Sequence, residues 1–208
     1  PTSEILEFLS AGGPLVPDDC VKERIDILHV STHHIDKYFD EVHLSHNNIT
    51  IHLGVNSKAT NFQLEQFAHN NMTFRIPDVK GFQPENEQID DSQILDNVEC
   101  TSFLVHDACA TLKEEGFDVG VSDDPGRYCC NYIYYKSLRR QMKQSPEKKR
   151  AIFVHVPPFH VIDKETQIRF VTRVIELLCS PSYCESDSIF NFSSIACGFS
   201  GVLCGSMK

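Results

Sequence analysis

The sequence lacks the features that would mark a membrane protein, a secreted protein or a zinc protein. It has no apolar run of about 18 residues, the length that a transmembrane helix needs, and no recognisable signal peptide. Its nine cysteines include no C-x-x-C pair, the spacing typical of zinc sites. Their odd number and irregular spacing favour reduced thiols over a disulfide framework. The sequence therefore predicts a cytoplasmic protein without a zinc site.

Basic residues are also scarce. The chain has 19 Lys and Arg against 29 Asp and Glu, a net charge of −10 at pH 7. Because such a chain repels polyanions, we expect neither a nucleic acid nor a membrane surface as a partner. The 208 residues suit one domain with a sizeable core. The first residue is Pro1, not Met, so we expect a fragment or a processed chain.

Apolar periodicity alternates between strand and helix through the first 179 residues. Extended segments are expected at residues 24–30, 48–55, 61–67, 117–122 and 151–156, and helices at 3–10, 32–42, 101–115, 127–143 and 164–179. This alternation predicts an α/β fold, a three-layer α/β/α sandwich with a mostly parallel twisted sheet.

Two regions depart from this alternation. Residues 70–98 are polar and contain proline and glycine, and a loop of that length is usually functional or mobile. From Ser180 onward Ser, Cys, Phe and Gly dominate, without a clear helix or strand pattern. We therefore expect one α/β domain over residues 1–179 and a divergent tail over residues 180–208, peripheral or disordered.

Two adjacent cysteines stand where a helix is expected to begin. Cys129 and Cys130 follow the predicted strand 117–122 and a polar turn at 123–126. In the first turn of a helix the N–H groups have no partner within the helix, and the helix dipole favours negative charge. A thiol there can have a lowered pKa and act as a nucleophile. The alternative is two small residues buried at a helix start.

A histidine is expected at the same edge of the sheet. His155 lies at the carboxyl end of the buried strand 151–156, and sites in open α/β sheets form outside such ends. Imidazole can take the thiol proton of Cys130 and return it to a leaving amine. Alone, His155 could equally be a core histidine.

A third group should orient the imidazole. Glu65 is the best candidate because it interrupts an apolar-bounded segment, although it could be a plain surface carboxylate. Arg75, in the long loop, could line a site or simply be solvated.

These residues resemble the motifs of the type I pyroglutamyl peptidases. In that family a glycine lies four residues before the catalytic cysteine, and an Asn or Asp follows the cysteine. Gly126, Cys130 and Asn131 match these three positions. The hydrophobic strand that ends in His-Val-Pro matches residues 153–157. Glu65 with Asn70 is similar to the family's glutamate segment, and residues 75–78 to its substrate loop. The resemblance runs in order from Pro1 to about Cys179.

The resemblance implies a cysteine exopeptidase that removes N-terminal pyroglutamyl residues from small peptides, without a metal or cofactor. Cys130 would be the nucleophile, His155 the general base and then acid, and Glu65 the group that orients it. The implied substrate-binding residues are Arg75, Ile76, Tyr128 and Cys129. Of these, Arg75 would help to stabilise the oxyanion.

The chain also departs from the family pattern. The family opens with a strand and a loop rich in glycine and phenylalanine, and here Pro1-Thr2-Ser3 resembles only the stretch that follows them. Losing that strand would leave an inner edge of the sheet uncovered. An inactive relative that binds or regulates another molecule, or a thiol hydrolase for another amide, therefore remains open.

Overall fold

One mixed sheet forms the centre of the molecule. The computed structural model describes residues 2–11, 21–42, 48–180 and 191–198. The six strands of the sheet are β1 (Val21–His29), β2 (Asn48–Val55), β3 (Phe62–Glu65), β6 (Val119–Ser122), β7 (Ala151–Val156) and β8 (Asn191–Gly198). They lie in the order β1-β8-β2-β7-β3-β6, and all neighbours are parallel except β3 and β7. The predicted α/β class is therefore confirmed.

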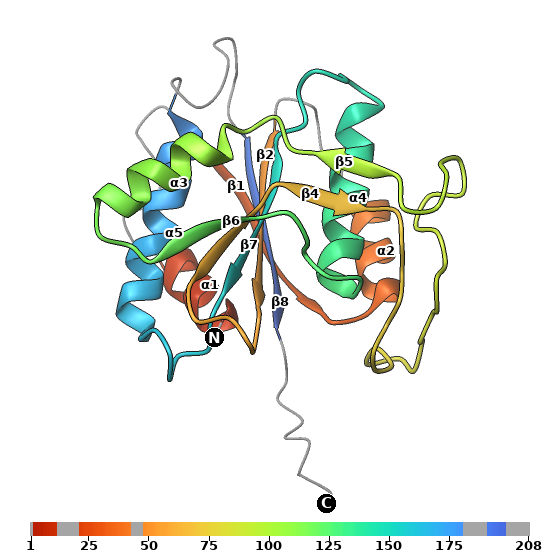
Figure 1. The fold of residues 1–208 in the computed structure, drawn as a ribbon, viewed down its shortest axis with the longest axis horizontal. Helices are drawn as coiled ribbons and strands as arrows, with labels where there is room; N and C mark the ends of the chain where they lie inside the picture. Colours follow the sequence, from red (N-terminus) through yellow and green to blue (C-terminus); the bar gives the residue numbers. More distant parts are fainter. Residues whose placement is uncertain (1, 12–20, 43–47, 181–190, 199–208) are drawn as a thin grey trace, which may run out of the picture.

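Helices cover both faces of this sheet, as Figure 1 shows. The helices on one face are α1 (Thr2–Ser10), α3 (Val105–Glu114) and α5 (Lys164–Cys179), and those on the other are α2 (Thr32–Glu41) and α4 (Cys129–Met142). Each helix buries an apolar stripe against the sheet, which is the arrangement that alternating strands and helices favour.

The two faces of the sheet have separate cores because side chains alternate along a strand. In β2, Ile49, Ile51 and Leu53 belong to the cluster with α1, α3 and α5. Phe153 of β7 belongs to the cluster with α2 and α4. This second face carries the chemistry described below.

The strand β8 corrects the prediction for the tail. We expected no helix or strand beyond Ser180, yet residues 191–198 pair in parallel with both β1 and β2, in the interior of the sheet. The inner position that we expected to be uncovered is therefore filled by a strand from near the end of the sequence. Residues 181–190 and 199–208 of the predicted tail lie outside the described residues.

A second, two-stranded ribbon lies beside the sheet. It pairs β4 (Phe67–His69) with β5 (Val98–Cys100) in antiparallel orientation, and it encloses the long loop between them. The prediction of a loop at residues 70–98 is thus nearly right. The helix predicted from residue 101 begins later, at Val105 in α3, because the N–H groups of Thr101 and Ser102 donate to the carbonyls of Gln66 and Lys149 instead.

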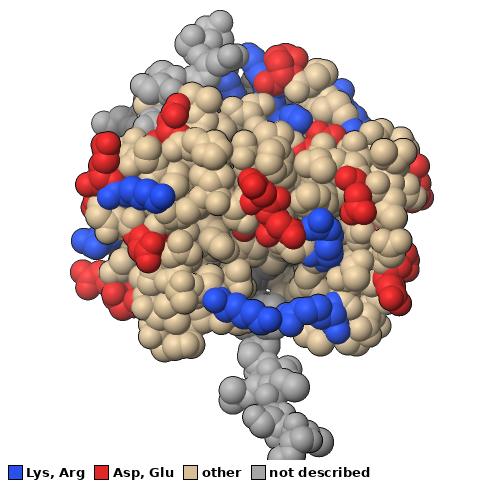
Figure 2. Space-filling view, in the orientation of Figure 1, with Lys and Arg blue, Asp and Glu red and all other residues tan. Residues whose placement is uncertain are grey.

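Charges of both signs are scattered over the face seen in Figure 2. Among the described residues visible there, basic and acidic side chains are interspersed on a largely uncharged surface. Among the described helices, none has the length and apolar character needed to cross a membrane.

Candidate active site

His155 and Glu65 meet at the carboxyl end of β7. His155 Nδ1 lies 2.6 Å from Glu65 Oε1, and both residues are buried, with 6% and 0% of their surfaces exposed. The contact arises because β3 runs antiparallel to β7 and places Glu65 opposite Phe153, two residues before His155. Diagonal neighbours of this kind lie on the same face of a sheet. A carboxylate on Nδ1 leaves the other ring nitrogen, Nε2, to exchange a proton.

The thiol of Cys130 lies over the strand next to His155. A Cβ atom built on Gly54 would lie 3.2 Å from Cys130 Sγ, so the sulfur sits directly above this glycine. Gly54 of β2 is the register partner of His155 in β7, and paired residues of neighbouring strands lie about 5 Å apart and point the same way. Gly54, which no sequence motif points to, therefore provides the space that the sulfur occupies beside the imidazole.

The first turn of α4 is fixed by Asn131. Its side-chain oxygen accepts a hydrogen bond from the His69 N–H at 2.8 Å, and its amide group donates to the carbonyls of His69 and Asn71. Asn131 is fully buried, so these three bonds anchor the helix start to the chain just after Glu65. In the sequence, Asn131 stands out only as a motif position. The feature of the sequence that could have indicated its anchoring role is the presence of a side-chain amide directly after a candidate nucleophile.

The four predicted substrate-binding residues lie near the start of α4 but differ in accessibility. Arg75 and Ile76 are exposed, and Tyr128 is partly buried. Burial raises the pKa of Tyr128 to about 12. Cys129, Asp78 and Cys130 add to the rise, and the positive charge of Arg75 opposes it. Cys129 is fully buried among the apolar residues of α4, so a substrate could reach its side chain only if neighbours moved. Their roles remain predictions.

The loop that carries Arg75 and Ile76 is held in one shape. Asp78 is buried and accepts hydrogen bonds from the N–H groups of Lys80, Phe82 and Thr32, at 2.8, 3.0 and 3.1 Å. The hydroxyl of Tyr128 donates to the carbonyl of Pro77 at 3.1 Å. The exposed side chains of this loop are therefore presented by a rigid backbone next to the start of α4.

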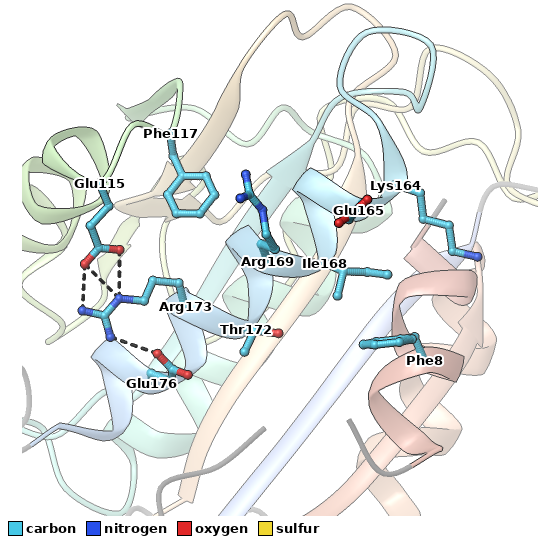
Figure 3. Close-up of a pocket in the computed structure, with 10 residues that line it drawn as sticks. All are labelled: Phe8, Glu115, Phe117, Lys164, Glu165, Ile168, Arg169, Thr172, Arg173 and Glu176. Atoms are coloured by element: carbon cyan, nitrogen blue, oxygen red, sulfur yellow. Dashed lines mark hydrogen bonds and ion pairs between the residues drawn. The ribbon is translucent and has the colours of Figure 1, made fainter. Parts of the chain in front are cut away.

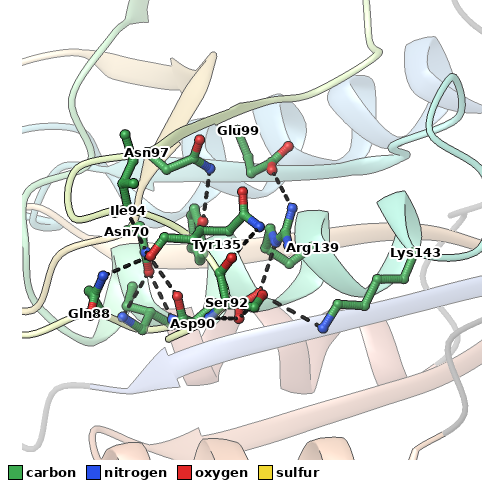
Figure 4. Close-up of polar contacts among 12 residues, drawn as sticks. Asn70, Gln88, Asp90, Ser92, Ile94, Asn97, Glu99, Tyr135, Arg139 and Lys143 are labelled. Atoms are coloured by element: carbon green, nitrogen blue, oxygen red, sulfur yellow. Dashed lines mark hydrogen bonds and ion pairs between the residues drawn. The ribbon is translucent and has the colours of Figure 1, made fainter.

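Asn70 organises the rest of the long loop (Figure 4). Its side-chain oxygen accepts bonds from the N–H groups of Ile89 and Asp90, and its amide nitrogen donates to the carbonyls of Asp90, Gln93 and Ile94. These contacts explain why a polar segment without regular structure has a defined path.

Arg139 of α4 holds the same loop through an ion pair with Asp90, and it holds β5 through a buried ion pair with Glu99. Its guanidinium lies 3.0 Å from a carboxylate oxygen of Asp90 and 3.0 Å from one of Glu99. Figure 4 draws these two contacts. Burial opposes ionisation of Asp90, but hydrogen bonds from Ser92 and Arg139 keep its pKa at about 2. The loop is therefore anchored to the helix that carries Cys130.

A cavity of about 800 Å³ lies elsewhere, on the face covered by α1 and α5 (Figure 3). Phe8, Phe117 and Ile168 supply its apolar lining, and Arg173 on its rim forms ion pairs with Glu115 and Glu176. None of its lining residues belongs to the predicted site. Among the described residues, no group of three or more His, Cys, Asp or Glu could hold a metal ion.

Comparison with known families gives one match over most of the chain. The family model described as pyroglutamyl peptidase matches residues 17–174. Among curated proteins, a pyrrolidone-carboxylate peptidase of Thermococcus litoralis is 31% identical over 136 residues, which are 64% of this chain and 59% of that protein. A human pyroglutamyl-peptidase 1-like protein is 32% identical over 112 residues, 53% of this chain and 52% of that protein. The chain thus spans little more than half the length of these relatives.

Solved structures share the fold. A mutant pyrrolidone carboxyl peptidase of Pyrococcus furiosus aligns with a TM-score of 0.61 and 25% identity, over 73% of this chain and 78% of that one. The peptidase of Fervidobacterium islandicum aligns with a TM-score of 0.67 over 86% of this chain and 88% of that one, at 23% identity. At 23% identity, the similarity to the Fervidobacterium islandicum structure shows only that the two chains share a fold.

Proposed function

The chain belongs to the pyroglutamyl peptidase family, and from that premise we propose that it is a cysteine exopeptidase that hydrolyses the N-terminal pyroglutamyl residue from peptides. The observation that carries the proposal is the 2.6 Å contact between His155 Nδ1 and Glu65 Oε1, with Cys130 Sγ seated over Gly54 beside the imidazole. We further propose that the protein is cytoplasmic and acts on small peptides.

The first half of the reaction would form an acyl-enzyme. Nε2 of His155 takes the proton of Cys130, and the thiolate attacks the carbonyl carbon of the pyroglutamyl group. Glu65 accepts the hydrogen bond of Nδ1–H and stabilises the positive charge on the ring. The tetrahedral intermediate collapses when the C–N bond breaks, and His155 gives its proton to the leaving amine.

The second half would release pyroglutamate. Water, deprotonated by His155, attacks the thioester carbon, and the sulfur leaves as the thiolate and regains its proton from the imidazole. The first-turn N–H groups of α4, together with the exposed guanidinium of Arg75, are the donors that we propose for the oxyanion.

Substrate recognition would depend on a neutral amino end. A pyroglutamyl group is a lactam without charge, so an apolar wall suits it better than a carboxylate would. We assign this wall to Ile76 and Tyr128, on the rigid loop and at the start of α4, with Cys129 behind them.

The test is hydrolysis of a fluorogenic pyroglutamyl amide by the full chain. The parent should release the fluorophore and Cys130→Ala should not, while prolyl and free-glutamyl amides should be cleaved at least about 100-fold more slowly. Cleavage that persists in Cys130→Ala would contradict the assignment of the nucleophile. A preference for another amide would favour a different thiol hydrolase, and no cleavage of any amide by folded parent protein would favour a binding or regulatory protein.

A further inference from the structure

Polar side chains recur at every third position on the buried face of α4. Asn131, Tyr134 and Ser137 are all fully buried, and each forms a hydrogen bond with another element. The Tyr134 hydroxyl donates to the main-chain carbonyl of Glu65 at 2.8 Å, and Ser137 lies 2.8 Å from Nε2 of His52. An apolar helix can slide on a sheet at little cost, whereas hydrogen bonds of defined direction fix its position.

Tyr134 connects the two elements that carry the candidate nucleophile and the candidate orienting group. It follows Cys130 by four residues, one turn of α4, so both side chains lie on the same side of the helix. Its hydroxyl reaches Glu65, the last residue of β3, whose carboxylate contacts His155. A single hydroxyl thus joins the helix of the sulfur to the strand of the carboxylate.

The carboxylate of Glu65 has few other supports. Oε1 contacts His155, but Oε2 has no hydrogen-bond partner among the described residues. Its position must therefore be set through its main chain. The next residue is held to β6 by the bond from Gln66 N to Ser122 O, at 2.8 Å, and the Tyr134 hydroxyl adds the bond to α4.

We propose that Tyr134 is a positioning residue for the array of Cys130, His155 and Glu65, acting through its hydrogen bond to the Glu65 carbonyl. The assignment rests on the proposed function for the identity of that array. Without this bond, α4 keeps its anchors at Asn131 and Ser137, but the end of β3 loses its direct contact with the helix, so the sulfur and the imidazole lose part of their alignment. Displacements of about 1 Å are sufficient to slow a reaction of this kind substantially.

The neighbouring tyrosine provides a matched control. Tyr134 and Tyr135 are both fully buried in α4, but the Tyr135 oxygen accepts its bond from the side chain of Asn97, at 3.0 Å, away from the site. Tyr134→Phe and Tyr135→Phe each remove one oxygen and keep the ring. Their difference therefore separates the contacts of the Tyr134 hydroxyl, with the Glu65 carbonyl and with the side chain of Thr101, from the general cost of losing a buried hydroxyl.

Two measurements on the folded variants test the proposal. One is the hydrolysis of the pyroglutamyl amide, and the other is the alkylation of Cys130 by iodoacetamide across about pH 5 to 9, followed by mass spectrometry of the peptide that contains it. For Tyr134→Phe we expect kcat to fall roughly tenfold with KM within about twofold, and alkylation near pH 6 to slow by several-fold. Tyr135→Phe should match the parent in both measurements.

The alkylation profile separates this proposal from the proposed function, because it requires no substrate. If the parent hydrolyses no amide but alkylation still slows only in Tyr134→Phe, the proposed function fails and the positioning role stands. An unchanged alkylation profile in folded Tyr134→Phe overturns the positioning role.

If that variant does not fold, 2,3-difluorotyrosine at position 134 replaces it, because it is a stronger hydrogen-bond donor of nearly the same shape. Faster alkylation near pH 6 would then support the proposal, and an unchanged rate would overturn it.

Discussion

At the scale of single residues, the contact between Glu65 and His155 depends on charge rather than shape. A glutamine at position 65 has the same size and can still accept a bond from Nδ1–H, but it carries no charge to stabilise the imidazolium. We expect Glu65→Gln to lower kcat/KM by about 100-fold or more, with little change in the free energy of unfolding because Glu65 Oε2 has no partner among the described residues. Amide hydrolysis and urea denaturation measure the two effects.

The control for this variant is another buried carboxylate. Glu99 is 6% exposed and pairs with Arg139 and Lys149, each at 3.0 Å, away from Cys130. Glu99→Gln should destabilise the fold and leave kcat of the folded enzyme near the parent value. Equal losses of kcat in the two variants would argue against a specific role for Glu65.

A second residue-scale prediction concerns pH. His52 is fully buried with its Nε2 near Ser137, and burial lowers its pKa from 6.5 to about 3. As the pH falls, the unfolded chain therefore protonates His52 before the folded protein does. The contribution of neutral His52 to the free energy of unfolding is complete above pH 6.5 and is lost as the pH falls from 6.5 to about 3. His52→Gln can keep a bond to Ser137 without titrating.

We expect the parent to lose about 1 kcal/mol more stability than His52→Gln between about pH 7 and pH 5.5. Urea denaturation at the two pH values measures this difference, in which the contributions of the other histidines cancel. Identical pH dependence in the two proteins would mean that His52 does not stay neutral in the folded state.

At the scale of elements, the packing of α4 on β2 depends on a missing side chain. A Cβ on Gly54 would lie 2.6 Å from Cζ of Phe153 and 3.2 Å from Cys130 Sγ, closer than this packing allows. We expect Gly54→Ala to cost about 1–3 kcal/mol in the free energy of unfolding and to displace the sulfur, so that Cys130 alkylation changes as well.

Gly120 of β6 provides the comparison within the same sheet. A Cβ on Gly120 would meet only Asn61 Nδ2, at an ordinary 3.6 Å. Gly120→Ala should therefore leave both the urea midpoint and Cys130 alkylation close to the parent values. If the two alanine variants behave alike, the close approach at Gly54 is not what fixes the helix.

Elements with a strong local pattern were predictable from sequence. The bounds of β7 and α5 match the prediction because one is a continuous apolar run and the other a long amphipathic repeat. The pairing of β3 with β7 was not predictable, since antiparallel orientation depends on distant parts of the chain. β8 was missed for the same reason: Ser, Cys and Gly give it no periodic pattern, and its position depends on β1 and β2.

The site shows the same division. Cys130 and His155 could be chosen from residue types at a helix start and a strand end, and Glu65 because it interrupts an apolar-bounded segment. Gly54 and Tyr134 could not, because their importance lies in what comes close to them in space.

At the scale of the whole molecule, the sheet depends on a strand from near the end of the sequence. β1 and β2 are not paired with each other, and β8 pairs with both. A proline in an interior strand removes a ladder hydrogen bond and is poorly tolerated. We expect Ile195→Pro to lower the free energy of unfolding by about 3 kcal/mol or more and to expose β1 to proteolysis.

The control is Ile195→Val, which keeps the backbone N–H and a β-branched residue at the same position. It should unfold at nearly the same urea concentration as the parent. Limited proteolysis followed by mass spectrometry locates the first cleavages, which we expect around residues 21–29 in Ile195→Pro. Resistance of that segment to protease in Ile195→Pro would mean that β8 is not required to hold β1.

This strand order also constrains how the protein is made. A ribosome delivers β1 and β2 long before β8, so among the described strands β1 lacks its partner until residues 191–198 have left the exit tunnel. During translation, the edges of β1 and β2 that β8 will join keep their backbone donors and acceptors unpaired with it, and it is then that a chaperone would have most to protect.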